Sequence, residues 1–270
     1  MIYTTFNFQL STFNFQIIML ILITNDDGIQ AKGIQTIARV AAKYGNVVVV
    51  APNGPRSAQS SALTIEVPVS VKPVPSDVEN ITQFAVSGTP ADCVKLAISQ
   101  LLDEKPDLVI SGINHGSNAS INVIYSGTIG AAIEGALHGI PSIGFSLCDH
   151  DADADFEPSM PYFEQIIAKT INSEMPKDIC LNVNAPKGEV KGIRACRQAE
   201  GRWANDFGKT PAPRANDYYW LIGDFMFLND NDMNADQCAI ENGYITVVPL
   251  QFDMTAYKAI EFCKQYETEA

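Results

Sequence analysis

The sequence predicts an α/β fold built on a mostly parallel sheet, with helices on both faces and an additional C-terminal region. Over the first two-thirds of the 270-residue chain, short runs of Val, Ile and Leu alternate with segments of helical periodicity. Runs that are apolar throughout are typical of parallel strands buried on both faces. After about residue 190, polar, aromatic and proline-containing stretches replace this alternation. These observations favour a Rossmann-like core followed by a C-terminal arm.

The expected elements follow one another as strand and helix. The helix predicted over residues 30–44 places Ile34, Ile37, Ala38 and Ala41 on one face. Residues 63–71, LTIEVPVSV, alternate in polarity and include Pro68, which suits an edge strand or a hairpin. The other core strands are expected at 17–24, 46–51, 83–87, 107–111, 141–147 and 179–184, and the other helices at 90–102, 128–138 and 159–172.

Three regions are expected along the chain. Residues 1–18 contain TFNFQ twice and read as a dispensable N-terminal extension. Residues 19–190 form the Rossmann-like α/β catalytic core. Residues 191–270 form the arm, with hairpins, a last strand at 243–249 and a helix at 254–266, packing on the core and on a partner subunit.

The N-terminal region has no features of a targeting segment. No basic residue precedes the apolar run, and IIMLILIT is too short to span a membrane. We therefore expect a cytoplasmic protein.

Composition limits the class of function. A hydrophobic content of 46% excludes wholesale disorder, and a net charge of −13 argues against binding to nucleic acid or to an anionic membrane. The six cysteines form no CxxC pair, so we expect them to be reduced and mostly buried. With only three histidines, a metal site built from several histidines is not expected.

Short polar loops follow the expected core strands. They contain NDDG at 25–28, PNGPRSA at 52–58, SGTPAD at 87–92 and SGINHGSN at 111–118. Because ligands bind beyond the carboxyl ends of strands in an open parallel sheet, these loops should converge on one ligand-binding edge.

Oxygen ligands in these loops predict a metal site. Asp26 and Asp27 offer carboxylates, Ser57 a hydroxyl and Asn114 an amide oxygen. Such hard ligands, few of them charged, suit Mg²⁺ or Mn²⁺. For the acid pair alone, the competing interpretation is an ordinary turn or helix cap, since Asp caps helices and Gly28 permits a positive φ.

A second group of small residues opens the helix expected near residue 128. Ser126, Gly127 and Thr128 could bind an anion through backbone N–H groups and the helix dipole, or could simply cap the helix. Thr89 and Asp92, on either side of Pro90, are expected first of all to form a capping box.

Other candidates carry less weight. The DHDADAD segment at 149–155 lacks the glycine and the glutamate of a calcium loop and is interpreted as a solvated acidic loop. His115 could donate a proton or be structural. Four aromatic residues could stack on a base, although packing is the simpler role: Trp203, Tyr218, Tyr219 and Trp220. Arg56 and Arg202 could steer phosphate.

Taken together, these segments resemble the SurE family, the survival-protein nucleotidases. The matching segments occur in the family's order and cover residues 20–147 densely, with a looser match in LNVNAP, RQAEGRW and GYITVVPL. The dense part comprises ILITNDDGI, VVVVAPNGPRSAQS, SGTPADCVKLA, DLVISGINHGSN and YSGTIGAAIEGALHGIPSIGFS.

The resemblance implies a phosphatase that acts on nucleoside monophosphates and depends on one divalent metal ion. It assigns Asp26, Asp27, Ser57 and Asn114 to the metal, and Asn25, Ser126, Gly127 and Thr128 to the phosphate. It also implies a homodimer or homotetramer with a C-terminal arm exchanged between subunits. Asn53 and Gly54 depart from the family pattern, in which a charged residue is common, so substrate preference is less well defined.

We therefore expect hydrolysis of nucleoside 5′-monophosphates, with 3′-monophosphates as further substrates, by a metal-bound water. Asp26, Asp27 and Asn114 are the expected catalytic residues. An aspartyl-phosphate on Asp26 is the mechanistic alternative. A haloacid-dehalogenase-like phosphatase is a further alternative, but it would need a DxD motif, whereas Asp26 and Asp27 are adjacent. The remaining alternative is a nucleotide- or metal-binding module without catalysis.

Overall fold

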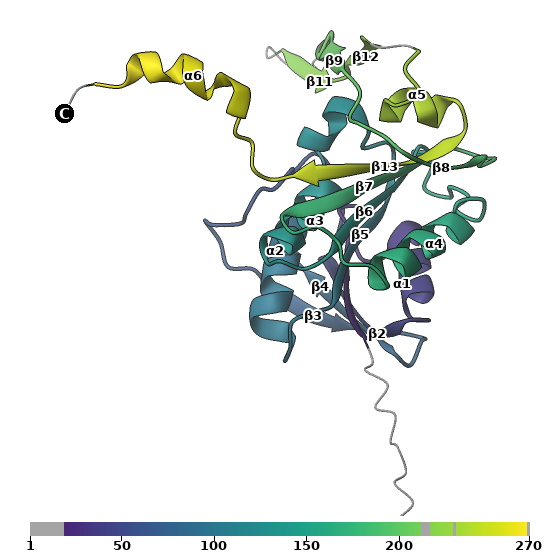
Figure 1. The fold of residues 1–270 in the computed structure, drawn as a ribbon. Helices are drawn as coiled ribbons and strands as arrows, with labels where there is room; N and C mark the ends of the chain where they lie inside the picture. Colours follow the sequence, from purple (N-terminus) through teal and green to yellow (C-terminus); the bar gives the residue numbers. More distant parts are fainter. Residues whose placement is uncertain (1–18, 212–216, 229–230, 269–270) are drawn as a thin grey trace, which may run out of the picture.

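A nine-stranded sheet runs through the molecule in the order β3-β4-β2-β1-β5-β6-β7-β13-β8 (Figure 1). The computed structural model describes residues 19–211, 217–228 and 231–268, so the predicted extension at 1–18 lies outside the described residues. The strands of this sheet are β1 (Met19–Thr24), β2 (Gly45–Pro52), β3 (Val71–Val74), β4 (Ile81–Val86), β5 (Leu108–His115), β6 (Ser142–Leu147), β7 (Ile179–Ala185), β8 (Gly192–Ala195) and β13 (Tyr244–Gln251).

The central strands are parallel, as the apolar runs predicted. From β4 through β7 every neighbouring pair is parallel, while β3 pairs antiparallel with β4 and β13 antiparallel with β7. The mostly parallel α/β fold is thus confirmed. The chain builds outward from β1 to β2 and β4, then crosses over to β5, β6 and β7 on the other side of β1.

Helices cover both faces of this sheet. Ile21 and Ile23 of β1 point into the core beneath α1 (Lys32–Ala41) and α4 (Met160–Ile171), where Phe163 packs against Phe145. Leu22 points to the opposite face, into a second cluster with residues of α2 (Pro90–Leu96) and α3 (Gly127–Leu137). A π-helical segment, η1 (Ala97–Leu101), extends α2. Alternate residues of one strand therefore serve two cores, which explains why the strands are apolar throughout.

The region after residue 190 contributes to the main sheet and to two small hairpin-like sheets. Strands β8 and β13 complete the nine-stranded sheet, and α5 (Asp236–Glu241) packs on β13. The small antiparallel sheets pair β9 (Gly201–Ala204) with β12 (Asp224–Phe227), and β10 (Phe207–Thr210) with β11 (Tyr218–Leu221). Strand β9 contacts the short 3-10 helix η2 (Ser120–Ile124), and the Trp203 indole of β9 donates a hydrogen bond to Asn122 of that helix.

The strand predicted at 63–71 is wrong for most of its length. The edge strand begins only at Val71 and ends at Val74, and residues 62–70 are irregular. Side chains take the place of strand pairing there: the carboxylate of Asp92 accepts from the N–H of Thr64, and the hydroxyl of Ser87 from the N–H of Ser70. The alternation in LTIEVPVSV was therefore not a sign of a half-buried strand.

The helix predicted at 254–266 forms only in part. A four-residue α-helix, α6 (Ile260–Cys263), lies between the three-residue 3-10 turns η3 (Tyr257–Ala259) and η4 (Lys264–Tyr266). Figure 1 shows this segment extending away from the body of the molecule. Since most helical stability in proteins comes from packing, a segment without a packing surface is short and irregular. Within the described ranges, no helix is long and apolar enough to cross a membrane.

Phe163→Ala should lower the free energy of unfolding by about 3–5 kcal/mol, because it leaves a cavity in the core beneath α4. Ile65 is 86% exposed in the irregular segment, so Ile65→Ala should change that free energy by less than about 0.5 kcal/mol. Urea denaturation measures both. A large loss in Ile65→Ala would show that residues 63–71 pack as a strand after all.

Candidate functional site

The candidate site lies where the strand order reverses, at the carboxyl ends of β1 and β5. These neighbouring strands are parallel, and Thr24 at the end of β1 is in register with Ser111 of β5. The chain leaves β1 toward one side of the sheet and β5 toward the other, so their ends border a crevice in which α/β proteins bind ligands. The sequence Asn25-Asp26-Asp27 follows β1 at this point, and Asn114 lies near the end of β5.

Asp26 is buried against the start of α3. The Thr128 hydroxyl donates a hydrogen bond to Asp26 Oδ1, and only 5% of the Asp26 surface is exposed. Gly127 permits this approach, because a Cβ atom at that position would lie 2.9 Å from the Cβ of Asp26. The first acid of the pair is therefore joined to the helix N-terminus that was predicted to bind an anion.

Asp27 is tied to the neighbouring strand. The backbone N–H of His115 donates to Asp27 Oδ2 at 3.1 Å. Gly28, with a φ of +100°, turns the chain after the acids, and a Cβ there would lie 3.1 Å from the backbone of Gly54. The pair is thus held by β5 on one side and by the loop after β2 on the other.

Burial disfavours the ionised form of both carboxylates. Desolvation raises the pKa of Asp26 to about 6; the Thr128 hydrogen bond works against this rise, and the charge of Asp27 adds to it. Desolvation also raises the pKa of Asp27, opposed by the hydrogen bond from His115 and by charge on His115 and His150. Two such groups side by side form an anionic pair that a cation would stabilise.

Asn114 and the Ser57 loop adjoin the acid pair. Asn114 donates from Nδ2 to the Gly116 carbonyl at 2.8 Å, and its Oδ1 accepts no hydrogen bond from the described residues. Ser57 is exposed, and its neighbour Arg56 donates a backbone N–H to the carbonyl of Asp26 at 2.7 Å. Both predicted neutral ligands therefore belong to segments attached to the acids.

Asn25 holds the turn that carries the acids. Its side chain is fully buried, donates to the Gly28 carbonyl at 3.0 Å and accepts from the Gly28 N–H at 3.2 Å. In this structure its amide is therefore engaged within the loop itself.

The helix N-terminus has the form required of an anion site. Ser126 caps α3, with its hydroxyl accepting from the N–H of Ile129 at 3.1 Å. The N–H groups of Gly127 and Thr128, in the first turn, have no partners within the helix. With the positive end of the helix dipole, they favour a negatively charged group at this position. The capping box predicted at Thr89 and Asp92 is also confirmed.

The donors present suit a hard divalent cation. In the part of the chain that the structure describes, no cluster of three or more His, Cys, Asp or Glu side chains is placed to hold a metal ion. A cation would instead rest on the two carboxylates, supplemented by the neutral oxygens of Asn114 and Ser57, a set typical of Mg²⁺ or Mn²⁺. The raised pKa values and the free Asn114 Oδ1 agree with this interpretation.

Sequence reasoning missed the loop after β6. His150 lies against Gly116, where a Cβ would come within 2.3 Å of its ring, and the Asp151 carbonyl is bonded to His115 Nδ1 at 2.8 Å. His150 and Asp151, at the start of the segment interpreted as a solvated acidic loop, thus lie beside the end of β5 that holds Asp27. Applying the strand-end rule to β6 would have found it, because this loop leaves the same edge of the sheet.

The weaker candidates are exposed or make other contacts with their side chains. The Arg56 guanidinium donates to the Ser87 carbonyl at 2.9 Å, so it secures the loop after β4 rather than facing an open site. The Trp203 indole N–H donates to Asn122 at 2.8 Å, while Trp220 on β11 is exposed. Arg202 is exposed on β9.

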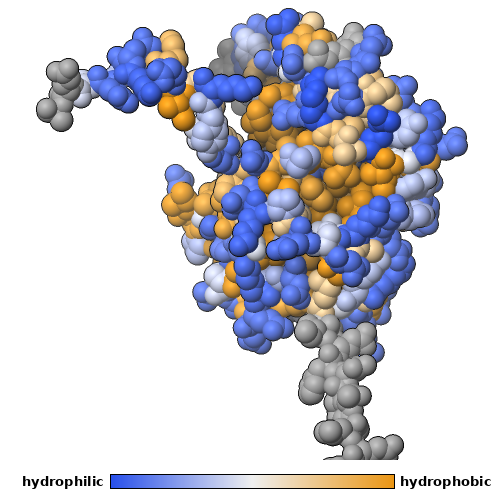
Figure 2. Space-filling model, in the orientation of Figure 1, coloured by the Kyte–Doolittle hydropathy of each residue, from blue (hydrophilic) through white to orange (hydrophobic). Residues whose placement is uncertain are grey.

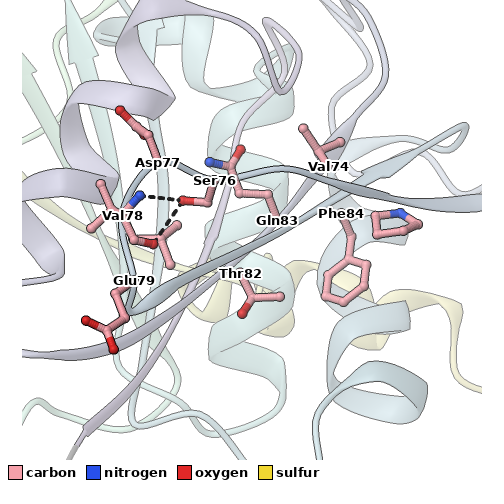
Figure 3. A pocket seen from close by; sticks show the side chains of 10 residues that line it. Val74, Ser76, Asp77, Val78, Glu79, Thr82, Gln83 and Phe84 are labelled. Carbon is pink, nitrogen blue, oxygen red and sulfur yellow. Dashed lines mark hydrogen bonds between the residues drawn. The ribbon is translucent and has the colours of Figure 1, made fainter.

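A pocket of about 480 Å³ at the β3–β4 edge is separate from this site (Figure 3). Its lining includes Asp77, Glu79 and Ser76, whose hydroxyl is bonded to the backbone of Val78. None of the predicted site residues lines it, and it presents two carboxylates with no basic side chain. It is a poor site for a phosphate.

Known proteins resemble this chain over most of its length. A model of the family described as Survival protein SurE matches residues 21–205. The 5′-nucleotidase SurE of Flavobacterium psychrophilum is 48% identical over 251 residues, which cover 92% of this chain and 97% of the relative. That of Flavobacterium johnsoniae is 50% identical over 245 residues, covering 90% and 94%.

A solved structure is similar as well. The crystal structure of the SurE protein from Aquifex aeolicus is 35% identical and covers 92% of this chain and all of its own, with a TM-score of 0.79.

Asp27→Asn should stabilise the metal-free protein. A raised pKa in the folded state means that folding favours the protonated carboxyl, so stability is lost as the pH rises from about 4 through the folded-state pKa. Removing one charge of the pair should therefore raise the free energy of unfolding at pH 8. Urea denaturation in EDTA measures this change, with a substitution of the exposed Asp153, Asp153→Asn, as the control. Lower stability in Asp27→Asn at pH 8 would contradict the repulsion.

Proposed function

The chain belongs to the SurE family and is a 5′-nucleotidase, which is a kind of phosphomonoesterase. We propose that it hydrolyses nucleoside 5′-monophosphates at the site formed by Asp26 and Asp27. We extend the proposal to nucleoside 3′-monophosphates as further substrates. The observation that carries it is a pair of adjacent acids at the point where the strand order reverses. Asp26 is buried and bonded directly to the capped N-terminus of α3, and Asp27 is half-buried and bonded to β5.

One divalent cation, Mg²⁺ or Mn²⁺, is the proposed cofactor. Asp26, Asp27, Ser57 and Asn114 would hold it. When bound, such an ion neutralises nearby negative charge, polarises a phosphate oxygen and lowers the pKa of a coordinated water. The raised pKa values of the two carboxylates support this assignment, since the ionised pair needs a compensating positive charge.

The start of α3 is the proposed phosphate site. The free N–H groups of Gly127 and Thr128 would bind phosphate oxygens, and Ser126 would keep the helix start in place. Such preorganised donors stabilise the charge that develops on the equatorial oxygens during phosphoryl transfer. In a protein with a net charge of −13, a local positive end of this kind is necessary for binding an anion.

Protein residues would perform the remaining tasks. Thr128 would link the phosphate to the acids, because its hydroxyl is bonded to Asp26 while its N–H lies in the first helical turn. Asn25 would act by closing the turn that presents the acids. The His115 N–H would orient Asp27.

We also propose that the chain forms a homodimer or homotetramer through its C-terminal arm. The segment from Met254 to Tyr266 exposes large apolar side chains, among them Phe262, and extends away from the body of the molecule (Figure 1). Figure 2 shows hydrophobic residues gathered over β7 and β13, and a groove of about 610 Å³ there is lined by residues such as Leu181 and Val247. Exposed apolar surfaces of this kind mark interaction sites.

Asp27→Asn should lower kcat/KM for AMP by about 100-fold or more, because the catalytic charge arrangement is lost. Phosphate release is measured from AMP, GMP and 3′-AMP with saturating Mg²⁺ or Mn²⁺, with and without EDTA. Asp153→Asn should retain the activity of the unaltered protein. Full activity of Asp27→Asn at saturating metal, or full activity of the unaltered protein in EDTA, would overturn the proposed metal site. If the unaltered protein released no phosphate under any of these conditions, a binding module without catalysis would be favoured.

Truncation after Phe252 should reduce the molar mass in solution to that of a single chain. Size-exclusion chromatography with light scattering measures it against the full-length protein. An unchanged oligomer after truncation, or a full-length protein that is already monomeric, would contradict the proposed role of the arm.

A further inference from the structure

One aromatic side chain stands beside the helix N-terminus with no partner in the described chain. Tyr125 directly precedes Ser126, the cap of α3, and 54% of its surface is exposed. Exposing a large ring in water forgoes the free energy that burial would provide. A ring left exposed at the edge of a ligand site is available to a planar ligand.

The backbone that carries this ring is held firmly. The Tyr125 carbonyl accepts from the Ser60 N–H at 3.0 Å, and its N–H donates to the Asn122 carbonyl at 3.1 Å. The Ser60 hydroxyl also donates to the carbonyl of Ile124 at 2.7 Å. The small sheet of the arm adds a further restraint, because the Trp203 indole bonds to the Asn122 side chain. With an exposed ring on a backbone that is held in place, Tyr125 has the properties of a recognition surface rather than of a loose loop residue.

A nucleotide bound at the start of α3 needs such a surface. Its phosphate would lie at Gly127 and Thr128, and its base, separated from the phosphate by the ribose, must lie a short distance outside. Consecutive Cα atoms are about 3.8 Å apart, so a side chain two or three positions before the phosphate-binding residues is within that reach. Bases stack on aromatic rings whatever their sequence identity.

We propose that Tyr125 stacks on the base of the substrate and so selects nucleotides over other phosphomonoesters. This inference rests on the proposed function of the same site. The other aromatic candidates are less suited. The Trp203 indole is bonded to Asn122, and Trp220 lies on β11, which pairs with β10 in a small sheet of the C-terminal arm.

Comparing AMP with ribose 5-phosphate, which lacks a base, isolates the stacking. Tyr125→Ala should raise the KM for AMP roughly ten-fold or more, as expected when a stacking ring is removed. Its kcat/KM for ribose 5-phosphate should stay that of the unaltered protein. Tyr125→Phe, which keeps the ring, should retain the KM for AMP. Trp220→Ala tests the rival position, and circular dichroism checks that each variant is folded.

The outcomes separate this inference from the proposed function when AMP binding is also measured by calorimetry. Equal losses with both substrates, no loss in Tyr125→Ala, or a selective loss in Trp220→Ala would overturn the role of Tyr125. If the unaltered protein released no phosphate but bound AMP in a Tyr125-dependent way, the proposed function would fail while the stacking surface stood. Binding of AMP that is indifferent to Tyr125→Ala would overturn the stacking surface whatever the activity.

Discussion

The burial of two adjacent carboxylates at the end of the central strand is the constraint on which the site depends. Asp26 and Asp27 must follow β1 without a break, because only there does the reversal of strand order leave a crevice. Their pKa values are raised by burial, so the fold forgoes stability to keep them there. Such a cost is typical of functional sites, where perturbed carboxylates gather.

The surrounding elements are arranged to support this pair. The helix α3 presents its N-terminus to Asp26, and the absence of a side chain at Gly127 allows the contact. The strand β5 supplies the N–H that Asp27 accepts, and the loop after β2 is bonded to the Asp26 carbonyl through Arg56. The two carboxylates thus have partners on both sides of β1. The site therefore depends on the arrangement of several strands and helices rather than on one loop.

Much of the fold and of the site could be predicted from the sequence, because both depend on local signals. Strands buried on both faces are apolar throughout, and β1 and β6 begin and end close to the predicted residues. Loops at strand ends converge by topology, so the segments carrying Asp26, Ser57 and Asn114 were expected to meet. The assignment of each ligand and substrate contact stays a prediction.

The parts that were missed depend on interactions that the sequence does not display. LTIEVPVSV alternates like a strand, yet side chains of Asp92 and Ser87 bind its backbone instead of a neighbouring strand. The segment around Ile260 has a helical pattern but lacks a packing surface in its own chain. The strand-end rule places the loop after β6 at the correct edge of the sheet, but the contact of His150 with Gly116 depends on the folded course of that loop.

The central claim is that the acid pair binds a cation, and calorimetric titration of metal-free protein with Mn²⁺ tests it most directly. The account predicts one ion bound per chain, with binding lost when Asp26 and Asp27 are both replaced by Asn and retained when the exposed Asp153 is replaced. Equal Mn²⁺ binding by the doubly substituted protein, or no binding by the unaltered one, would contradict it.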